Sequence, residues 1–175
     1  MGWISQYDLE FKGLTEGYHK FSYDVEDKFF GHFDQDIVSI GKLKIEVILE
    51  KRSTFLKLFF NIKGWVELTC DRCLELYQQQ IVHKDEILVK FGETDSINDD
   101  EIMWVMPGDH KLNLAQLIYE FIAVSIPLKH IHPSLKNGEY GCNREMIKKL
   151  KQYRPQKNEI SEPDPRWEAL KNIKY

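Results

Sequence analysis

The chain has 175 residues, of which 42% are apolar and 13% aromatic, with a net charge of −4 and three cysteines. This length suits one domain, or one domain with an appendage, and the composition can bury a core. No basic stretch followed by an apolar run opens the chain, and no apolar stretch approaches the roughly 20 residues of a membrane span. The odd cysteine count argues against a disulfide scaffold. We therefore expect a cytoplasmic protein with no signal peptide and no membrane partner.

The negative charge is unevenly distributed along the chain. Residues 142–175 contain nine lysines and arginines against five acids, a net charge of +4, so residues 1–141 carry −8. An acidic body disfavours indiscriminate nucleic-acid binding, because affinity for phosphate is largely electrostatic. The basic C-terminal part could still dock on RNA or on an acidic partner, although a solvated charged tail is the simpler interpretation.

The first half of the chain predicts mostly strands. Residues 4–11 and 17–25 suggest two short strands, and residues 24–36 suggest a helical turn or a loop. Residues 42–50 alternate apolar and charged side chains, which predicts a strand with one solvated face. Residues 55–62 and 66–70 continue this alternation, and Gly64 between them suits a bulge or a bend in a long strand.

Strand-like alternation resumes over residues 74–91. Cys70 and Cys73 therefore lie at the tip between two antiparallel strands. Residues 93–101 are acidic and predict an exposed loop before a strand at 102–106.

One strong helix is predicted at about 113–125. Asn113 and Gln116 form a capping box, and Pro127 follows the end of the helix. Its apolar stripe consists of Leu114, Leu117, Ile118, Phe121 and Ile122. A second helix runs from 142 or 143 to about 152 and stops at Pro155; residues 156–165 form a tether, and a last helical turn begins at Asp164.

These elements predict an α+β fold: a mainly antiparallel β-sheet or partly open barrel, with one long helix and a helical C-terminal appendage. We divide the chain into a β-rich core domain, residues 1–141, and a basic appendage with its tether, residues 142–175.

The cysteines and two histidines form a candidate metal site. Cys70 and Cys73 have the spacing of a metal knuckle, and the third cysteine, Cys142, follows His130 and His132. Thiolates and neutral imidazole are the usual ligands of structural zinc, and four protein ligands leave no open position for catalysis. The predicted ligands are Cys70, Cys73, His132 and Cys142, with His130 as a substitute for His132, and zinc is the only cofactor expected.

Two other interpretations of the Cys70 and Cys73 pair remain open. The thiols could pack as small apolar side chains at a sheet edge. A redox dithiol would need Cys70 at the start of a helix, where the helix dipole lowers a thiol pKa, whereas strands flank both sides here. The chain also lacks a phosphate-binding loop, a His-Glu-x-x-His motif and a Gly-x-Ser-x-Gly motif, so we expect neither an enzyme nor a small-molecule substrate.

The second helix offers a small nucleic-acid-binding pattern. Cations interleaved with an aromatic ring, on which a base can stack, favour RNA contact. The candidate contact residues are Lys148, Lys149, Lys151, Tyr153 and Arg154, with a solvated helix face as the alternative.

Several segments together resemble a known family. They are residues 66–75 around the two cysteines, residues 112–127 with the capped helix and its proline, His132 with Cys142, and residues 164–170, which read Asp-Pro-Arg-Trp-Glu-Ala-Leu. In combination they resemble the large ribosomal RNA subunit accumulation protein family of bacteria and plastids, also called YceD or domain-of-unknown-function family 177. This chain departs from members with a second C-terminal cysteine pair, because it has Cys142 alone.

The resemblance implies a non-enzymatic ribosome-biogenesis factor that supports accumulation or processing of large-subunit ribosomal RNA. Its expected partner is that RNA or a ribosomal or assembly protein. The alternative is a zinc-stapled protein-interaction module that makes no direct contact with RNA, which the acidic body favours.

Overall fold

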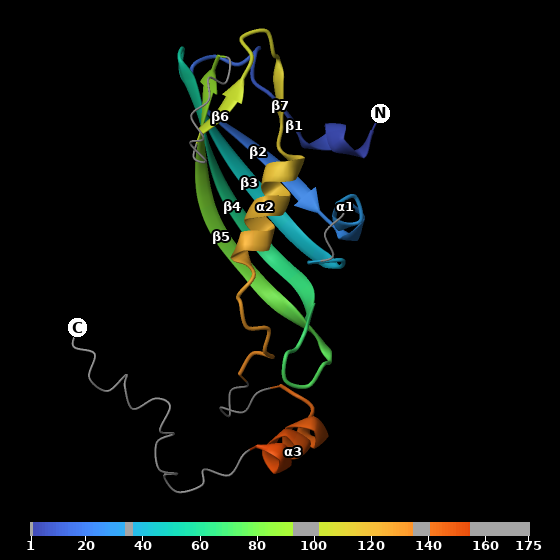
Figure 1. Ribbon diagram of the computed structural model, residues 1–175. Helices are drawn as coiled ribbons and strands as arrows, with labels where there is room; N and C mark the ends of the chain where they lie inside the picture. Colours follow the sequence, from blue (N-terminus) through green and yellow to red (C-terminus); the bar gives the residue numbers. More distant parts are fainter. Residues whose placement is uncertain (1, 34–36, 93–101, 135–140, 155–175) are drawn as a thin grey trace, which may run out of the picture.

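The computed structural model describes residues 2–33, 37–92, 102–134 and 141–154, and its main feature is a five-strand sheet (Figure 1). In spatial order the strands are β2 (Gly17–Val25), β3 (Gly41–Lys51), β4 (Phe55–Thr69), β5 (Leu76–Phe91) and β6 (Ile102–Val105). Strands β2 to β5 pair antiparallel, and β6 pairs parallel with β5. A small second sheet pairs β1 (Asp8–Glu10) with β7 (Lys111–Asn113).

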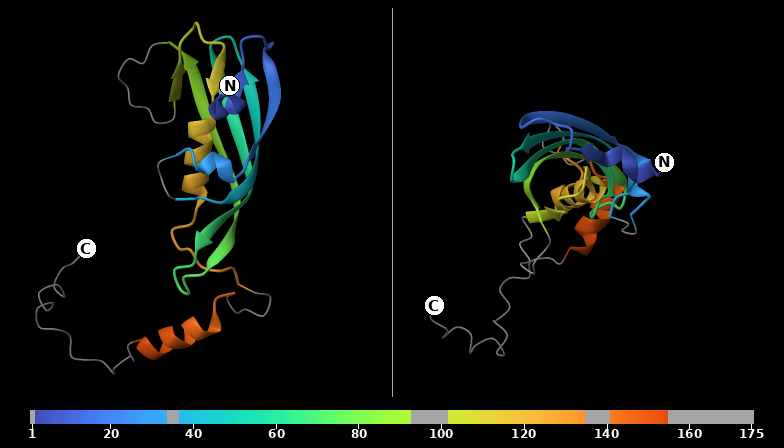
Figure 2. Two further views of the ribbon diagram at one scale, coloured as in Figure 1. Left: turned by 90° about the vertical axis from the view of Figure 1, so that its right-hand side faces the viewer. Right: turned by 90° about the horizontal axis from the view of Figure 1, so that it is seen from above.

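The helices are η1 (Trp3–Tyr7, a 3₁₀ helix), α1 (Asp27–Phe30), α2 (Ala115–Ser125) and α3 (Arg144–Tyr153). Figure 2 shows the sheet curving around α2, with α3 beyond the end of the sheet where β4 connects to β5. Because β2 and β6 are the two edges, the sheet of the described residues does not close into a barrel. The predicted α+β fold with a mainly antiparallel sheet is confirmed. Within the described ranges, no helix has the length and apolar character needed to cross a membrane.

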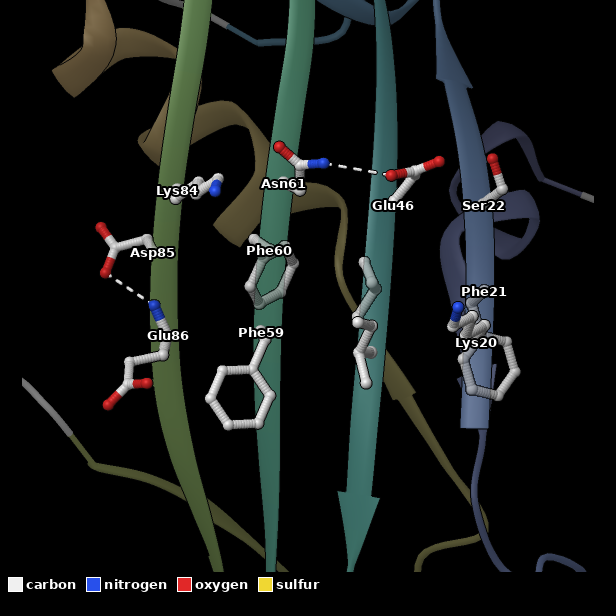
Figure 3. A pocket seen from close by; sticks show the side chains of 12 residues that line it. Lys20, Phe21, Ser22, Glu46, Phe59, Phe60, Asn61, Lys84, Asp85 and Glu86 are labelled. Atoms are coloured by element: carbon white, nitrogen blue, oxygen red, sulfur yellow. Dashed lines mark hydrogen bonds between the residues drawn. The ribbon is translucent and has the colours of Figure 1, made fainter. Parts of the chain in front are cut away.

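The alternation seen in the sequence sets the two faces of the sheet. On β3, Leu43, Ile45 and Val47 are buried toward α2, whereas Lys44 and Glu46 between them point outward. Figure 3 shows this outer face, with Asn61 of β4 beside Glu46 of β3, Phe59 further along β4, and α2 behind the sheet.

Helix α2 forms the other half of the core. All five residues of its predicted stripe face the sheet side, and four are buried, the exception being the partly buried Phe121. The Phe121 ring lies 5.0 Å from the ring of Phe60 on β4, edge to face, and Tyr119 stacks on Phe33 at 4.1 Å. The helix therefore fills the concave side of the sheet.

The structure corrects three local predictions. Residues 3–7 form the 3₁₀ helix η1 because Trp3 and Tyr7 both turn toward Phe29, so only residues 8–10 of the predicted first strand are extended. The Asn113 side chain accepts a hydrogen bond from the amide of Ala115 (3.1 Å), but Gln116 donates to Glu120 instead of completing a capping box.

The third correction concerns Gly64. Strand β4 runs through this glycine as one long strand, as predicted, and keeps a constant register with β3 and β5 on both sides, so of the predicted bulge or bend the bulge is excluded. Gly64 instead marks a close approach of two backbones, with φ +156° and a Cβ position that would overlap the carbonyl oxygen of Lys42. The predicted loop at 93–101 and the predicted tether and turn after residue 155 lie outside the described residues.

Tyr23 offers a test of core polarity. Its side chain is only 8% exposed, and its hydroxyl has no hydrogen-bond partner among the described residues. Tyr23→Phe keeps the ring and removes this hydroxyl, so we expect the free energy of unfolding at neutral pH to rise by about 1 kcal/mol. Urea denaturation measures it, and Tyr18→Phe, at a 66% exposed site, is the matched control with no expected change.

Alkaline pH should enlarge the difference in free energy of unfolding between Tyr23→Phe and the wild type. Burial, helped by the charge of Asp8, raises the pKa of Tyr23 to about 12 from an ordinary value of 10.0. Above pH 10 the unfolded chain therefore loses the Tyr23 proton before the folded protein does, and stability falls as the pH rises toward 12. The fall should be smaller in Tyr23→Phe than in the wild type; equal falls would contradict the burial of this hydroxyl.

Candidate metal centre

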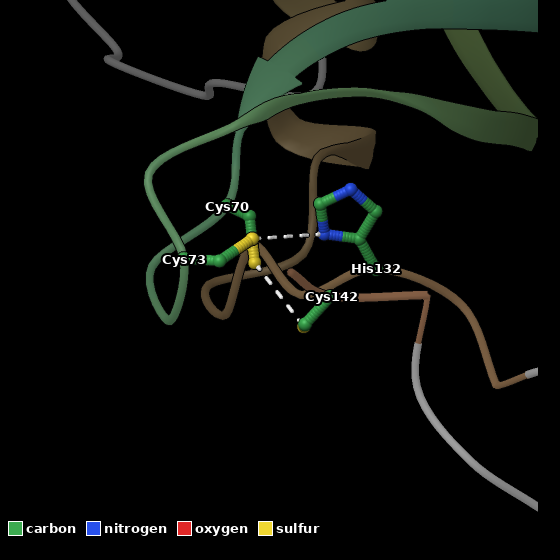
Figure 4. Close-up of side chains that lie close together, drawn as sticks. All are labelled: Cys70, Cys73, His132 and Cys142. Atoms are coloured by element: carbon green, nitrogen blue, oxygen red, sulfur yellow. Dashed lines mark hydrogen bonds between the residues drawn. The ribbon is translucent and has the colours of Figure 1, made fainter. Parts of the chain in front are cut away.

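Four predicted ligands from three separate segments meet at the end of the sheet. Cys70 and Cys73 lie in the turn between β4 and β5, His132 follows α2, and Cys142 precedes α3 (Figure 4). One ligand atom from each residue lies within 4.8 Å of the other three, and all three thiols are buried. The structure thus brings together the four residues predicted as ligands, although Cys70 and Cys142 are more than 70 residues apart in the sequence.

Two distances within the cluster match the edges of a tetrahedral zinc site. With zinc at about 2.3 Å from sulfur and about 2.0 Å from nitrogen, the tetrahedron has edges of roughly 3.8 Å between sulfurs and roughly 3.5 Å between sulfur and nitrogen. The Sγ atoms of Cys70 and Cys142 are 3.8 Å apart, and Sγ of Cys73 is 3.5 Å from Nδ1 of His132. Cys70, Cys73, His132 and Cys142 could therefore hold a zinc ion.

Electrostatics within the cluster favour a bound cation. Burial alone would raise the pKa of the Cys70 thiol, but hydrogen bonds from the backbones of Cys73, Arg72 and His132 lower it from 9.0 to about 6. Burial and the neighbouring Cys70 sulfur raise the pKa of the Cys142 thiol to about 11. The Cys70 thiolate is therefore stabilised, and its negative charge disfavours ionisation of the Cys142 thiol beside it. A divalent cation bound between the two sulfurs would offset this repulsion.

Backbone hydrogen bonds fix the turn that carries the cysteines. The amide of Cys70 donates to the carbonyl of Glu75, and the amide of Leu74 donates to the carbonyl of Cys70, both at 2.9 Å. Leu74 has φ +60°, a left-handed conformation that costs a leucine about 1–2 kcal/mol. The hydrogen bonds therefore hold the turn in a tight conformation despite the unfavourable backbone conformation of Leu74.

A two-way clasp joins this turn to the segment after α2. The amide of Asp71 donates to the carbonyl of His130 (2.7 Å), and the amide of His130 donates to the carboxylate of Asp71 (2.8 Å). His130 thus positions the segment through its backbone, and the imidazole in the cluster is that of His132. Sequence reasoning missed the clasp, because no sequence pattern reveals which backbone groups pair between distant segments.

The cluster also positions α3. Asn143 lies directly between Cys142 and the helix. Its side-chain nitrogen Nδ2 donates to the carboxylate of Glu75 (2.7 Å), and its side-chain oxygen accepts from the backbone amides of Glu145 and Met146. It is therefore the N-cap of α3 and a link to the turn at the same time. The predicted contact residues on this helix are all exposed: Lys148, Lys149, Lys151, Tyr153 and Arg154.

The fold and the cluster define an α+β protein with four residues at the tip of its sheet that could hold a zinc ion. A family model described as large ribosomal RNA subunit accumulation protein YceD matches residues 58–174. No curated protein and no solved structure matches the chain.

The chain belongs to the YceD family. The matched range includes all four cluster residues and α3, and the family description names accumulation of large ribosomal RNA subunits and no catalytic activity. Membership therefore implies a role in ribosome biogenesis.

Proposed function

We propose that this protein supports accumulation of the large ribosomal subunit by binding its RNA through α3, while a structural zinc ion holds α3 against the sheet. The observation that carries this proposal is the position of Cys142, which is both a member of the cluster and only two residues before α3. A bound ion would fix the start of the helix, so its exposed cations would be presented in one orientation.

The chemistry of α3 suits an RNA backbone. Lys148, Lys149 and Lys151 are exposed within two turns, and Tyr153, which is 85% exposed, offers a ring on which a base can stack. We accordingly divide the protein into a scaffold, residues 1–141, and an RNA-contacting appendage, residues 142–175, joined at the cluster.

Crosslinking in cells followed by RNA sequencing tests this function. The wild type should enrich precursor or mature large-subunit RNA, since phosphate contacts supply most of the affinity. Reversing the charge at both Lys148 and Lys149 to Glu should reduce the yield several-fold. The same reversal at Lys12 and Lys28, two exposed lysines outside α3, is the control. Background levels of this RNA with the wild type would refute direct binding.

The second candidate is an interaction module that binds a ribosomal or assembly protein without contacting RNA. The net charge of −8 over residues 1–141 favours it, because an acidic surface repels phosphate and attracts basic proteins. Ribonuclease treatment separates the two: association with ribosomal material that survives complete RNA digestion supports the protein-binding module.

A further inference from the structure

The outer face of the five-strand sheet has no role in the proposed function. Helix α2 covers the inner face, and no described helix crosses the outer one (Figure 2). The outer face carries two hollows, each lined by charged and aromatic side chains.

The larger hollow is a poor anion site. It has a volume of about 680 Å³ around Phe59, and Figure 3 shows its polar lining. Two lysines, Lys20 and Lys84, face three acids, namely Glu46, Asp85 and Glu86. The net charge of its lining is therefore −1, which disfavours an anion.

The second hollow, of about 300 Å³, lies nearer the cluster end of the sheet and has a different charge pattern. Strand register places Lys44 of β3 directly opposite Lys63 of β4, and Lys42 directly opposite Trp65. We call these four residues the Lys-Trp patch. All three lysines are exposed, and Trp65 is partly exposed.

The paired lysines are only partly compensated, because Asp24 of β2 lies directly opposite Lys44 but no acid lies opposite Lys63 on either neighbouring strand. Like charges directly opposite each other on a sheet are destabilising. Lys44 and Lys63 form no ion pair with a described residue, while Lys42 lies 3.4 Å from Glu26 in a pair whose side chains are 71% and 67% exposed. Such an exposed pair contributes little. The hollow holds three lysines against two acids, and because both acids lie on its β2 side, the excess of positive charge is at Lys63, beside the ring of Trp65.

We propose that the Lys-Trp patch is a second RNA contact, where Lys44 and Lys63 bind phosphates of a single strand and Trp65 stacks on a base. The inference rests on the proposed function, because it assigns a further surface to the same ligand. Two adjacent cations match the repeated charge of a nucleic-acid backbone, and stacking on an aromatic ring tolerates any base. Asp24 and Glu26, which line the β2 side of the hollow, would keep the strand toward β4 and β5.

Fluorescence anisotropy with a labelled 20-nucleotide oligouridine, titrated with the full chain, tests the patch. Lys44→Glu and Lys63→Glu should each weaken binding about tenfold and lower the slope of log affinity against log salt by about 1. Lys63→Glu also replaces a like-charge pair by an opposite one, so its melting temperature should not fall. Lys44→Glu makes the same gain toward Lys63 but places a second acid opposite Asp24 of β2, so its melting temperature should change little. Lys20→Glu, the same charge change on the same face but outside the patch, is the matched control.

Trp65 variants separate stacking from charge. Trp65→Leu should lower the affinity at least about fivefold without changing the salt slope, and Trp65→Phe should retain most of the affinity. Unchanged binding by Lys44→Glu and Lys63→Glu, together with loss of binding on charge reversal at Lys148 and Lys149, would overturn the patch and leave the proposed function intact. A wild type that binds no RNA would overturn both.

Discussion

Cys70→Ser and His132→Ala are each expected to lower the free energy of unfolding by more than about 4 kcal/mol. Loss of a structural metal is among the few single changes with so large an effect, because binding of the ion is coupled to folding. Here the four ligands tie together the β4–β5 turn, the segment after α2 and the start of α3. Denaturant unfolding of protein purified without chelator measures the change, with metal content determined on the same samples.

His130→Ala is the matched control for this prediction. It lies two residues from His132, and its interactions with Asp71 use backbone atoms that alanine retains. We expect this variant to keep its metal and to lose less than about 1 kcal/mol of stability. If His130→Ala and His132→Ala lost equal stability, or if chelation left the wild type unchanged, the thiols would be ordinary core packing.

Gly64→Ala should also destabilise the fold strongly, by more than about 3 kcal/mol. The added Cβ would overlap the carbonyl oxygen of Lys42 and lie 2.6 Å from Cα of Leu43, both on the neighbouring strand β3. These are backbone atoms that cannot move aside without breaking the sheet ladder, and φ +156° adds strain for any residue with a Cβ. Thermal or urea unfolding of the purified variant gives the magnitude.

Gly13→Ala is the matched control, since its Cβ would meet nothing within 4 Å. A surface substitution of this kind changes stability by about 0.5 kcal/mol or less. Similar losses at Gly13 and Gly64 would show that β3 and β4 do not approach as closely as described.

Long periodic segments made most of the fold predictable. The alternation over residues 42–91 is strong because one face of each strand is buried and the other is solvated, so β3, β4 and β5 follow from it. Strand β7 has only three residues, too few to show a period, and β1 is equally short. Their pairing depends on tertiary contacts that bring residues 8–10 beside residues 111–113.

The members of the candidate metal centre could be predicted because cysteine and histidine are the usual ligands of zinc, but the contacts that bring them together could not. Three cysteines and a histidine formed a plausible ligand set, and the sequence already favoured His132 with His130 as its substitute. The structure places the imidazole of His132 in the cluster, while the backbone of His130 forms the clasp with Asp71. The Lys-Trp patch had no sequence signal, because Lys44 and Lys63 become neighbours only through strand register. A shift of register by one residue would have separated them.

Zinc-edge X-ray absorption on protein purified without chelator tests the central claim most directly, namely that the cluster holds a structural zinc ion. The account predicts about one zinc per chain, with three sulfur neighbours at about 2.3 Å and one nitrogen at about 2.0 Å. A single-ligand variant such as Cys142→Ser should lose the ion. Protein without zinc, or zinc surrounded by oxygen ligands instead of the three cysteines, would contradict it.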